Sequence, residues 1–207
     1  MSDPTLVTWN KLAGLYEEKF MDLTIYDQSY EQFTGLISGP KAAILDVGCG
    51  PGNVARYLQR KNPDWCFHGV DAAPNMVELF RKNIPGSTVT VMDIRNIGTL
   101  KRSFDGIVAG FCIPYLNDQD TEHLIKVLSS MLNQQGCLYI SFVEGDPASS
   151  GLLTSSTGDQ TYFYYHRLER IQEIMQAAGM QLSPVIHVLY TRSADQQEMH
   201  TILIGRL

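Results

Sequence analysis

The sequence has few of the features that mark metal-dependent, disulfide-linked or membrane proteins. Its four cysteines stand alone at positions 49, 66, 112 and 137, with no Cys-x-x-Cys pair, and its five histidines form no His-x-x-x-His motif. Neither a zinc site nor redox chemistry is therefore predicted. No apolar run approaches the roughly 18 residues that span a bilayer, and the N-terminus lacks the layout of a signal peptide. We expect no metal, no membrane association and a cytoplasmic location.

Basic residues are outnumbered by acidic ones, which argues against nucleic acid as a partner. The net charge is -6, from 16 Lys and Arg and 22 Asp and Glu. A wide nucleic-acid surface needs an excess of positive charge. Hydrophobic residues make up 44% of the 207 residues, which is typical of an ordinary globular protein. This length predicts one domain, residues 1–207.

Beyond the first forty residues, strand-like and helix-like segments alternate. The strand-like segments are continuous apolar or β-branched runs, and the helix-like segments repeat apolar residues at a period of 3.6. Strands are predicted at 42–47, 65–71, 88–94, 104–111 and 136–144, and helices at 53–61, 73–83, 119–132 and 165–178. Alternation of this kind favours an α/β fold with a parallel sheet covered by helices. Two further strands, 183–191 and 199–207, look like a closing hairpin.

Two segments differ from this pattern. Residues 1–40 read as a helical cap ahead of a core at 41–207. In the cap, Trp9, Leu12, Ala13, Tyr16 and Phe20 lie along one face of a helix, and a second amphipathic piece follows. The cap either covers the carboxyl edge of the sheet or only seals the core.

Residues 145–160 are rich in Gly, Ser and Thr without periodicity, which is typical of a lid or a disordered loop.

The stretch ILDVGCGPGNV, residues 44–54, predicts a glycine-rich ligand-binding loop after the first strand. It is not the dinucleotide fingerprint, because Asn53 stands where its last glycine would be. Asp46 also precedes the loop. At about 6 Å and an effective dielectric near 20, its repulsion of a pyrophosphate charge costs roughly 3 kcal/mol. The loop therefore favours a ligand with positive charge. Asp71, 25 residues after Asp46, is suited to accept hydrogen bonds from both hydroxyls of a ribose.

Three motifs in order resemble the class I S-adenosylmethionine-dependent methyltransferases. ILDVGCGPG is similar to the first motif of that family, VDAAPNMVELFR to the second and VMDIRNI to the third. The resemblance covers about residues 42–144. It implies a three-layer Rossmann-like fold whose seven strands have the order 3-2-1-4-5-7-6, with the last strand antiparallel.

The resemblance also implies the cofactor, S-adenosylmethionine, and the residues around it. Met76 would pack on the adenine, Asp93 would accept from its amino group, and the Ile94 amide would donate to a ring nitrogen. The methionyl end would lie over the glycine loop near Asp46, and Tyr16 would cover the cofactor. The full implied set is Tyr16, Asp46, Gly48, Cys49, Gly50, Asp71, Ala72, Met76, Asp93, Ile94 and Phe111.

The methyl acceptor is predicted to be a small molecule that reacts at nitrogen, oxygen or carbon. After strand four the sequence reads GFCIPYL, which retains only Pro114-Tyr115 of the Asn/Asp-Pro-Pro-Tyr motif of relatives that methylate bases and glutamine. This departure and the acidic net charge argue against nucleic-acid or protein acceptors. If a general base assists, Glu144 and His166 are the candidates, with Tyr115 as a possible positioning group.

Two other functions remain open at this point. A catalytically silent domain that binds S-adenosylmethionine, or only a partner, would share the same motifs. A nicotinamide-dependent oxidoreductase would share the glycine loop and the acid after strand two, but it predicts a glycine at Asn53 and an apolar residue at Asp46. The sequence does not indicate the oligomeric state.

Overall fold

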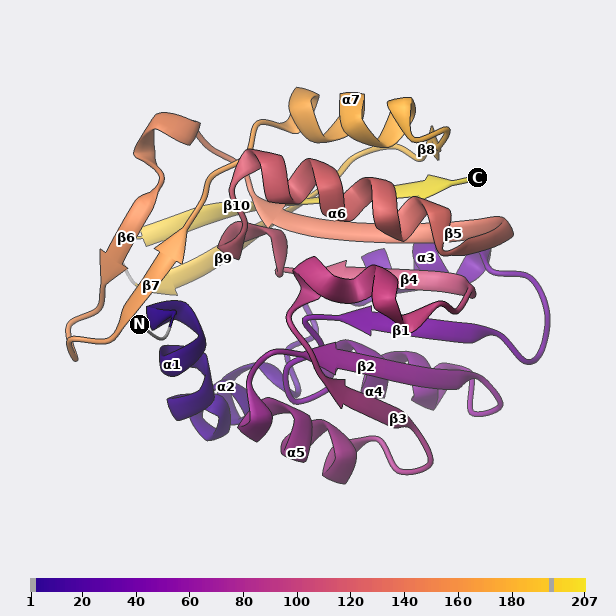
Figure 1. The fold of residues 1–207 in the computed structure, drawn as a ribbon, viewed down its shortest axis with the longest axis horizontal. Helices are drawn as coiled ribbons and strands as arrows, with labels where there is room; N and C mark the ends of the chain where they lie inside the picture. Colours follow the sequence, from indigo (N-terminus) through magenta and orange to yellow (C-terminus); the bar gives the residue numbers. More distant parts are fainter. Residues whose placement is uncertain (1–2, 194–195) are drawn as a thin grey trace.

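The computed structural model describes residues 3–193 and 196–207, which form one mixed sheet with helices on both faces (Figure 1). The strand order is β3-β2-β1-β4-β5-β10-β8, with β9 also paired to β10. The first five strands are parallel, and β10 is antiparallel to β5. The strands are β1 Ala43–Val47, β2 Cys66–Asp71, β3 Thr88–Val91, β4 Phe104–Gly110, β5 Leu132–Val143, β8 Gln181–Leu182, β9 Ile186–Ser193 and β10 Gln196–Arg206. The predicted order is confirmed, with β10 as the seventh strand and β9 as the sixth.

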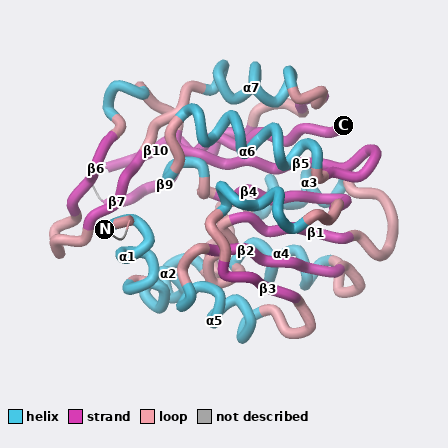
Figure 2. The backbone as a smooth tube through the Cα atoms, in the orientation of Figure 1, coloured by secondary structure: helices cyan, strands magenta, loops and turns pink. Residues whose placement is uncertain are grey.

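Helices cover the two faces of the sheet as separate layers (Figure 2). Neighbouring strand residues point to opposite faces, so Ile44 packs into one core cluster and Leu45 into the other. The cluster around Ile44 includes side chains of α3, α4 and α5, and the cluster around Leu45 includes those of η1, α6 and α7. The helices are α3 Asp27–Leu36, α4 Asn53–Lys61, α5 Pro74–Asn83, η1 Ile94–Leu100, α6 Asp118–Ser130 and α7 Leu168–Ala177.

Local signals start the helices just after the strands end. Pro74 occupies the first turn of α5, where its missing amide hydrogen costs nothing. The side chain of Asn117 accepts a hydrogen bond from the Asp120 amide at 2.8 Å and caps α6. Each helix N-terminus therefore lies near the carboxyl edge of the sheet, where ligands bind in folds of this type.

The stretch from Trp9 to Phe20, which the sequence suggests is one helical face, belongs to two helices. α1 spans Pro4–Lys11 and α2 spans Ala13–Phe20, with Leu12 at φ -91 and ψ 9 between them. Both helices lie beside the carboxyl ends of the parallel strands (Figure 1). The break changes the direction of the chain, so Trp9 and Tyr16 come from different helices while their rings still touch, with centroids 5.6 Å apart.

Residues 145–160 do not form a disordered loop, so that alternative is wrong. They form η3 Pro147–Ser149 and the strand β6 Gly151–Thr154, which pairs with β7 Gln160–Phe163. This hairpin is bonded to α1: Thr8 Oγ1 donates to the Gln160 carbonyl at 2.7 Å, and the Tyr162 amide donates to Thr5 Oγ1 at 2.9 Å. That this segment acts as a lid stays a prediction.

The two closing strands pair as predicted, but they are longer. β9 and β10 continue through much of the expected loop 192–198, whose residues 194 and 195 lie outside the described residues. Among residues 3–193 and 196–207, no helix has the length and apolar character needed to cross a membrane.

Candidate functional site

A cavity lies at the carboxyl edge of the sheet, between the strand ends and the N-terminal helices. Its lining combines the glycine loop, the ends of β2 and β4, η1, η2 Ile113–Tyr115 and the first two helices. The structure brings together nine of the eleven predicted cofactor residues: Tyr16, Gly48, Gly50, Asp71, Ala72, Met76, Asp93, Ile94 and Phe111 all line this cavity.

Two glycines of the loop have backbone conformations that disfavour a side chain. Gly48 has φ +65, and a Cβ added there would lie 2.7 Å from the Cβ of Cys112. Gly50 has φ +51, and a Cβ there would project toward the cavity, 3.7 Å from Tyr16 and 4.0 Å from Met76. Positive φ is strained for residues with a Cβ. The loop is thus a cradle that a side chain at Gly50 would partly fill.

Asp71 is the carboxylate best placed to bind a ligand. Its Oδ2 accepts a hydrogen bond from the Gly50 amide at 2.9 Å, and its Oδ1 accepts one from the Ala73 amide at 2.9 Å. Burial raises the pKa of Asp71, and the amides of Ala73, Gly50 and Ala72 oppose that rise. A carboxylate offers about four acceptor positions, so each oxygen retains capacity for a second donor such as a ribose hydroxyl.

Asp46 and Cys49 belong to the loop but do not line the cavity. Asp46 is 3% exposed, and its Oδ2 is buried with no hydrogen-bond partner among the residues that the structure describes. Burial raises its pKa to about 8, although the Ala55 amide opposes the rise. Cys49 is also buried, and burial raises the pKa of its thiol. Asp46 is therefore protonated near neutral pH, and it would attract a ligand in the cavity only where a positive charge on that ligand favours its ionised form.

At the end of β3, Asp93 lines the cavity but is already engaged. Its Oδ1 accepts a hydrogen bond from the Arg95 amide at 2.9 Å, and its Oδ2 pairs with Arg95 Nη1 at 3.0 Å. Arg95 also pairs with Asp120 at 3.0 Å. An adenine amino group would share Asp93 with Arg95. The carboxylate has enough acceptor positions for both.

Three aromatic rings from three elements form another part of the lining. Trp9 of α1 contacts Tyr16 of α2 and Tyr115 of η2 edge-on, with ring centroids 5.6 and 5.5 Å away. Burial, together with the carboxylates of Asp71 and Asp46, raises the pKa of the Tyr16 phenol. Tyr16 therefore stays protonated near neutral pH and keeps a hydrogen to donate.

Phe111 lies at the end of β4 in a conformation that residues with side chains seldom adopt. Its φ is +53, and its amide donates to Ser141 Oγ at 3.0 Å. The ring packs against His200, with centroids 4.6 Å apart. Strained residues of this kind are often found at functional sites, because the surrounding structure must hold them in place. Phe111 is part of the cavity lining.

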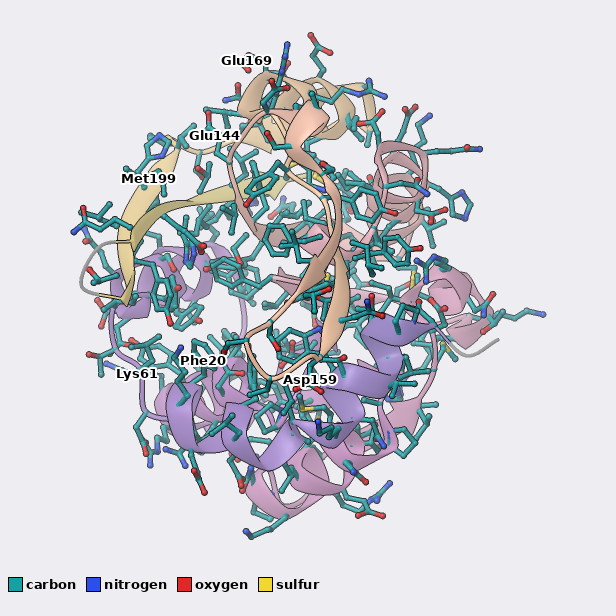
Figure 3. The ribbon with its side chains drawn as sticks, turned by 90° about the vertical axis from the view of Figure 1, so that its left-hand side faces the viewer. Phe20, Lys61, Glu144, Asp159, Glu169 and Met199 are labelled. Atoms are coloured by element: carbon teal, nitrogen blue, oxygen red, sulfur yellow. The ribbon has the colours of Figure 1, made fainter. Side chains whose placement is uncertain are left out.

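Glu144 and His166 are not part of this cavity. Glu144 accepts a hydrogen bond from Thr201 Oγ1 at 3.0 Å. His166 is 3% exposed, its Nε2 donates to the Ile113 carbonyl at 3.0 Å, and burial lowers its pKa. Seen from the carboxyl edge, Glu144 lies near Met199, far from Asp159 at the tip of the hairpin (Figure 3). Of the three candidates for the acceptor chemistry, only Tyr115 lines the cavity.

Sequence reasoning missed nine lining residues. Some of them flank predicted residues, and strand-end position alone could have indicated them. Others come from α1 or follow η2, and no motif in the sequence marks them. The missed residues are Asp3, Thr5, Leu6, Trp9, Ala73, Arg95, Gly110, Cys112 and Leu116.

The sequence is similar to known methyltransferases over its central part. Residues 44–136 match the family described as a methyltransferase domain. The demethylmenaquinone methyltransferase of Thermotoga maritima is 32% identical over 97 residues, which is 47% of this chain and 42% of that protein. The trans-aconitate 2-methyltransferase of Escherichia coli is 34% identical over 97 residues, 47% of this chain and 37% of that protein. The chain thus spans about half or less of the length of these curated relatives.

The fold likeness extends over nearly the whole chain. A crystal structure of an S-adenosylmethionine-dependent methyltransferase from Clostridium acetobutylicum superposes with a TM-score of 0.73, at 15% identity, over 96% of this chain and 98% of that one. At this identity the likeness shows the fold. The chain therefore has the fold of S-adenosylmethionine-dependent methyltransferases, and over residues 44–136 its sequence is similar to a methyltransferase domain.

Proposed function

We propose that this protein binds S-adenosylmethionine in the cavity at the sheet edge and transfers its methyl group to a small-molecule acceptor. One observation carries the proposal: the Asp71 carboxylate is held by the Gly50 amide directly beside a glycine cradle that opens into the cavity. An acid that suits a ribose thus lies beside a loop that a ligand can approach closely.

The lining residues suit the parts of this cofactor. Asp71 would accept from the ribose hydroxyls, Met76 and Ala72 would pack against the nucleoside, and Asp93 would accept from the adenine amino group. The glycine cradle would take the amino-acid end. Asp46, buried at the base of the loop, holds its proton near neutral pH in the free protein; a positive ligand would favour its ionised form, which a pyrophosphate would not.

The cofactor, when bound, supplies a methyl group on a positively charged sulfur, which is already activated for displacement by a nucleophile. The protein then has to hold the acceptor in line and exclude water. Tyr16, Phe111 and Tyr115 line the cavity and would enclose the reacting groups. Tyr115 can position an acceptor by hydrogen bonding, whereas Glu144 and His166 are not among the lining residues.

A small acceptor is supported by the names of the relatives and by the charge of this chain. The curated relatives are named for demethylmenaquinone and trans-aconitate, both small molecules. The net charge of -6 disfavours nucleic acid. The reacting atom, nitrogen, oxygen or carbon, is not determined by these features.

Two titrations and one transfer assay test this proposal. In isothermal titration, S-adenosylmethionine and S-adenosylhomocysteine should bind and NAD should not. A methyl-labelled cofactor should then transfer its label to a fraction of a small-molecule extract, and the Asp71→Ala variant should do so much more slowly. Binding without transfer would favour a catalytically silent domain, and NAD binding would favour an oxidoreductase.

A further inference from the structure

The cavity has a second, chemically different part that the nucleoside site does not account for. We call Trp9, Tyr16 and Tyr115 the aromatic wall. Trp9 touches both tyrosines edge-on, with centroids 5.6 and 5.5 Å away, and all three rings line the cavity. Tyr16 is expected to cover the cofactor. Trp9 and Tyr115 are not among the residues predicted to bind the cofactor.

The β6–β7 hairpin holds the aromatic wall in place. It is bonded to α1, which carries Trp9, through Thr8 and Thr5. It is also bonded to η2, which carries Tyr115, because the Tyr164 amide donates to the Pro114 carbonyl at 2.7 Å. Behind Tyr115, the ring of Phe163 packs edge-on at 6.1 Å. One hairpin thus positions two helical segments so that their aromatic rings meet.

The charge of the cavity restricts what can lie against this wall. The acidic and basic side chains in the lining are Asp3, Asp71, Asp93 and Arg95. Arg95 is the sole cation of the lining within residues 3–193 and 196–207, and it is paired with both Asp93 and Asp120. Without the cofactor, a carboxylate ligand would enter a cavity whose described lining carries three carboxylates and one guanidinium that is already paired. The cavity therefore disfavours anions.

Trp9 also offers a donor that is not in use. Its indole Nε1 is buried and has no hydrogen-bond partner in the described structure. Buried donors are nearly always paired, and an unpaired one is costly. A ligand oxygen or nitrogen that accepts from this N–H, after a small turn of the ring, would satisfy it.

We propose that the methyl acceptor is a neutral, flat aromatic molecule with a hydrogen-bond-accepting atom, bound against the aromatic wall. That the bound molecule accepts the methyl group rests on the proposed function. Its binding at the aromatic wall does not. Aromatic pairs are favourable beyond the area they bury, so a flat ring binds better than a saturated ring of equal size. The neutral charge follows from the carboxylates, and the accepting atom follows from Trp9.

Isothermal titration with three matched probes tests this assignment. The probes are 2-naphthol, 2-naphthoate and the saturated analogue 2-decalol, each titrated into the free protein and into the protein saturated with S-adenosylhomocysteine. We expect 2-naphthol to bind at least about tenfold more tightly than 2-naphthoate, and about two- to tenfold more tightly than 2-decalol. Titration of S-adenosylhomocysteine alone comes first. If it does not bind, the proposed function fails, while the probe titrations on the free protein still test the wall.

Variants of Trp9 separate the ring from its donor. Trp9→Ala should weaken 2-naphthol about tenfold or more, and Trp9→Phe, which keeps a ring, should weaken it about two- to tenfold. Trp65→Phe is the matched control, because Trp65 is buried away from the cavity and should change nothing. Equal binding of 2-naphthol and 2-naphthoate, no binding of 2-naphthol by the unaltered protein, or unchanged affinity in Trp9→Ala would overturn the proposal. If Trp9→Ala weakens binding and Trp9→Phe does not, the aromatic ring contributes to the affinity and the indole N–H donor does not.

Discussion

Asp46 should make the stability of this protein depend on pH. Its carboxyl group is 3% exposed with one oxygen unpartnered, and burial raises its pKa from 3.8 to about 8. Below about pH 4 both the folded and the unfolded chain carry the proton. Between about pH 4 and pH 8 the unfolded chain loses it and the folded chain keeps it. Folding then takes up a proton, so the contribution to stability is lost as the pH rises through this window.

The magnitude follows from the size of the pKa rise. Each unit of difference in pKa corresponds to about 1.36 kcal/mol, so the upper limit across the window is about 5 to 6 kcal/mol. Asp46→Asn removes the titration and keeps a polar group of the same size. We expect the free energy of unfolding of the unaltered protein to fall more steeply from pH 5 to pH 7.5 than that of Asp46→Asn, by up to about 1.36 kcal/mol per pH unit.

Urea denaturation at four pH values from 5 to 8 measures both slopes. Asp64→Asn, at an exposed aspartate, is the matched control and should keep the slope of the unaltered protein. Parallel slopes for the unaltered protein and Asp46→Asn would refute the reasoning, because they would mean that Asp46 is ionised in the folded state near neutral pH. A positive ligand in the cavity favours the ionised form, so its binding at pH 7 should release a proton.

Three further variants test separate parts of the site. Asp71→Ala should weaken S-adenosylhomocysteine by about 1.5 to 3 kcal/mol in isothermal titration, because charge-assisted hydrogen bonds are lost; unchanged affinity would remove Asp71 from the site. Gly48→Ala should lower the free energy of unfolding, measured in urea, by roughly 1 to 3 kcal/mol more than Gly39→Ala does. Both glycines have a positive φ, but a Cβ at Gly48 would meet Cys112, whereas a Cβ at Gly39 would have no described atom within 4 Å. Equal losses would mean that the backbone strain accounts for the whole effect. His166→Ala should cost about 1 to 3 kcal/mol of stability, because a buried hydrogen bond to the Ile113 carbonyl is lost and that carbonyl keeps, among the described residues, only the Leu116 amide. Methyl transfer per folded molecule should not change; lost transfer at unchanged stability would make His166 catalytic after all.

The parallel part of the fold could be predicted because both faces of the sheet are buried. Ile44 and Leu45 enter different cores, so the strand around them reads as an unbroken apolar run. The acid at Asp71 and the glycines of the loop were found for a related reason. They follow strand ends, and parallel strands bring those ends to one edge.

The hairpin at 151–163 could not be found in this way. Its strands are four residues each, and their pairing depends on a turn in which the Ser155 amide donates to the Asp159 carbonyl at 2.8 Å. The hairpin is also bonded to α1, more than 140 positions earlier in the sequence, through the bond from Thr8 to Gln160. Trp9 was missed as a site residue for the same reason. A helical period shows which side is apolar, but it does not show that this side faces a cavity.

The most direct test of the account is a crystal structure of the protein with S-adenosylhomocysteine. The account predicts the ribose hydroxyls within hydrogen-bond distance of the Asp71 carboxylate, and the amino-acid end of the ligand over Gly50. A ligand bound elsewhere, or an Asp71 side chain turned away from a ligand that fills this cavity, would contradict it.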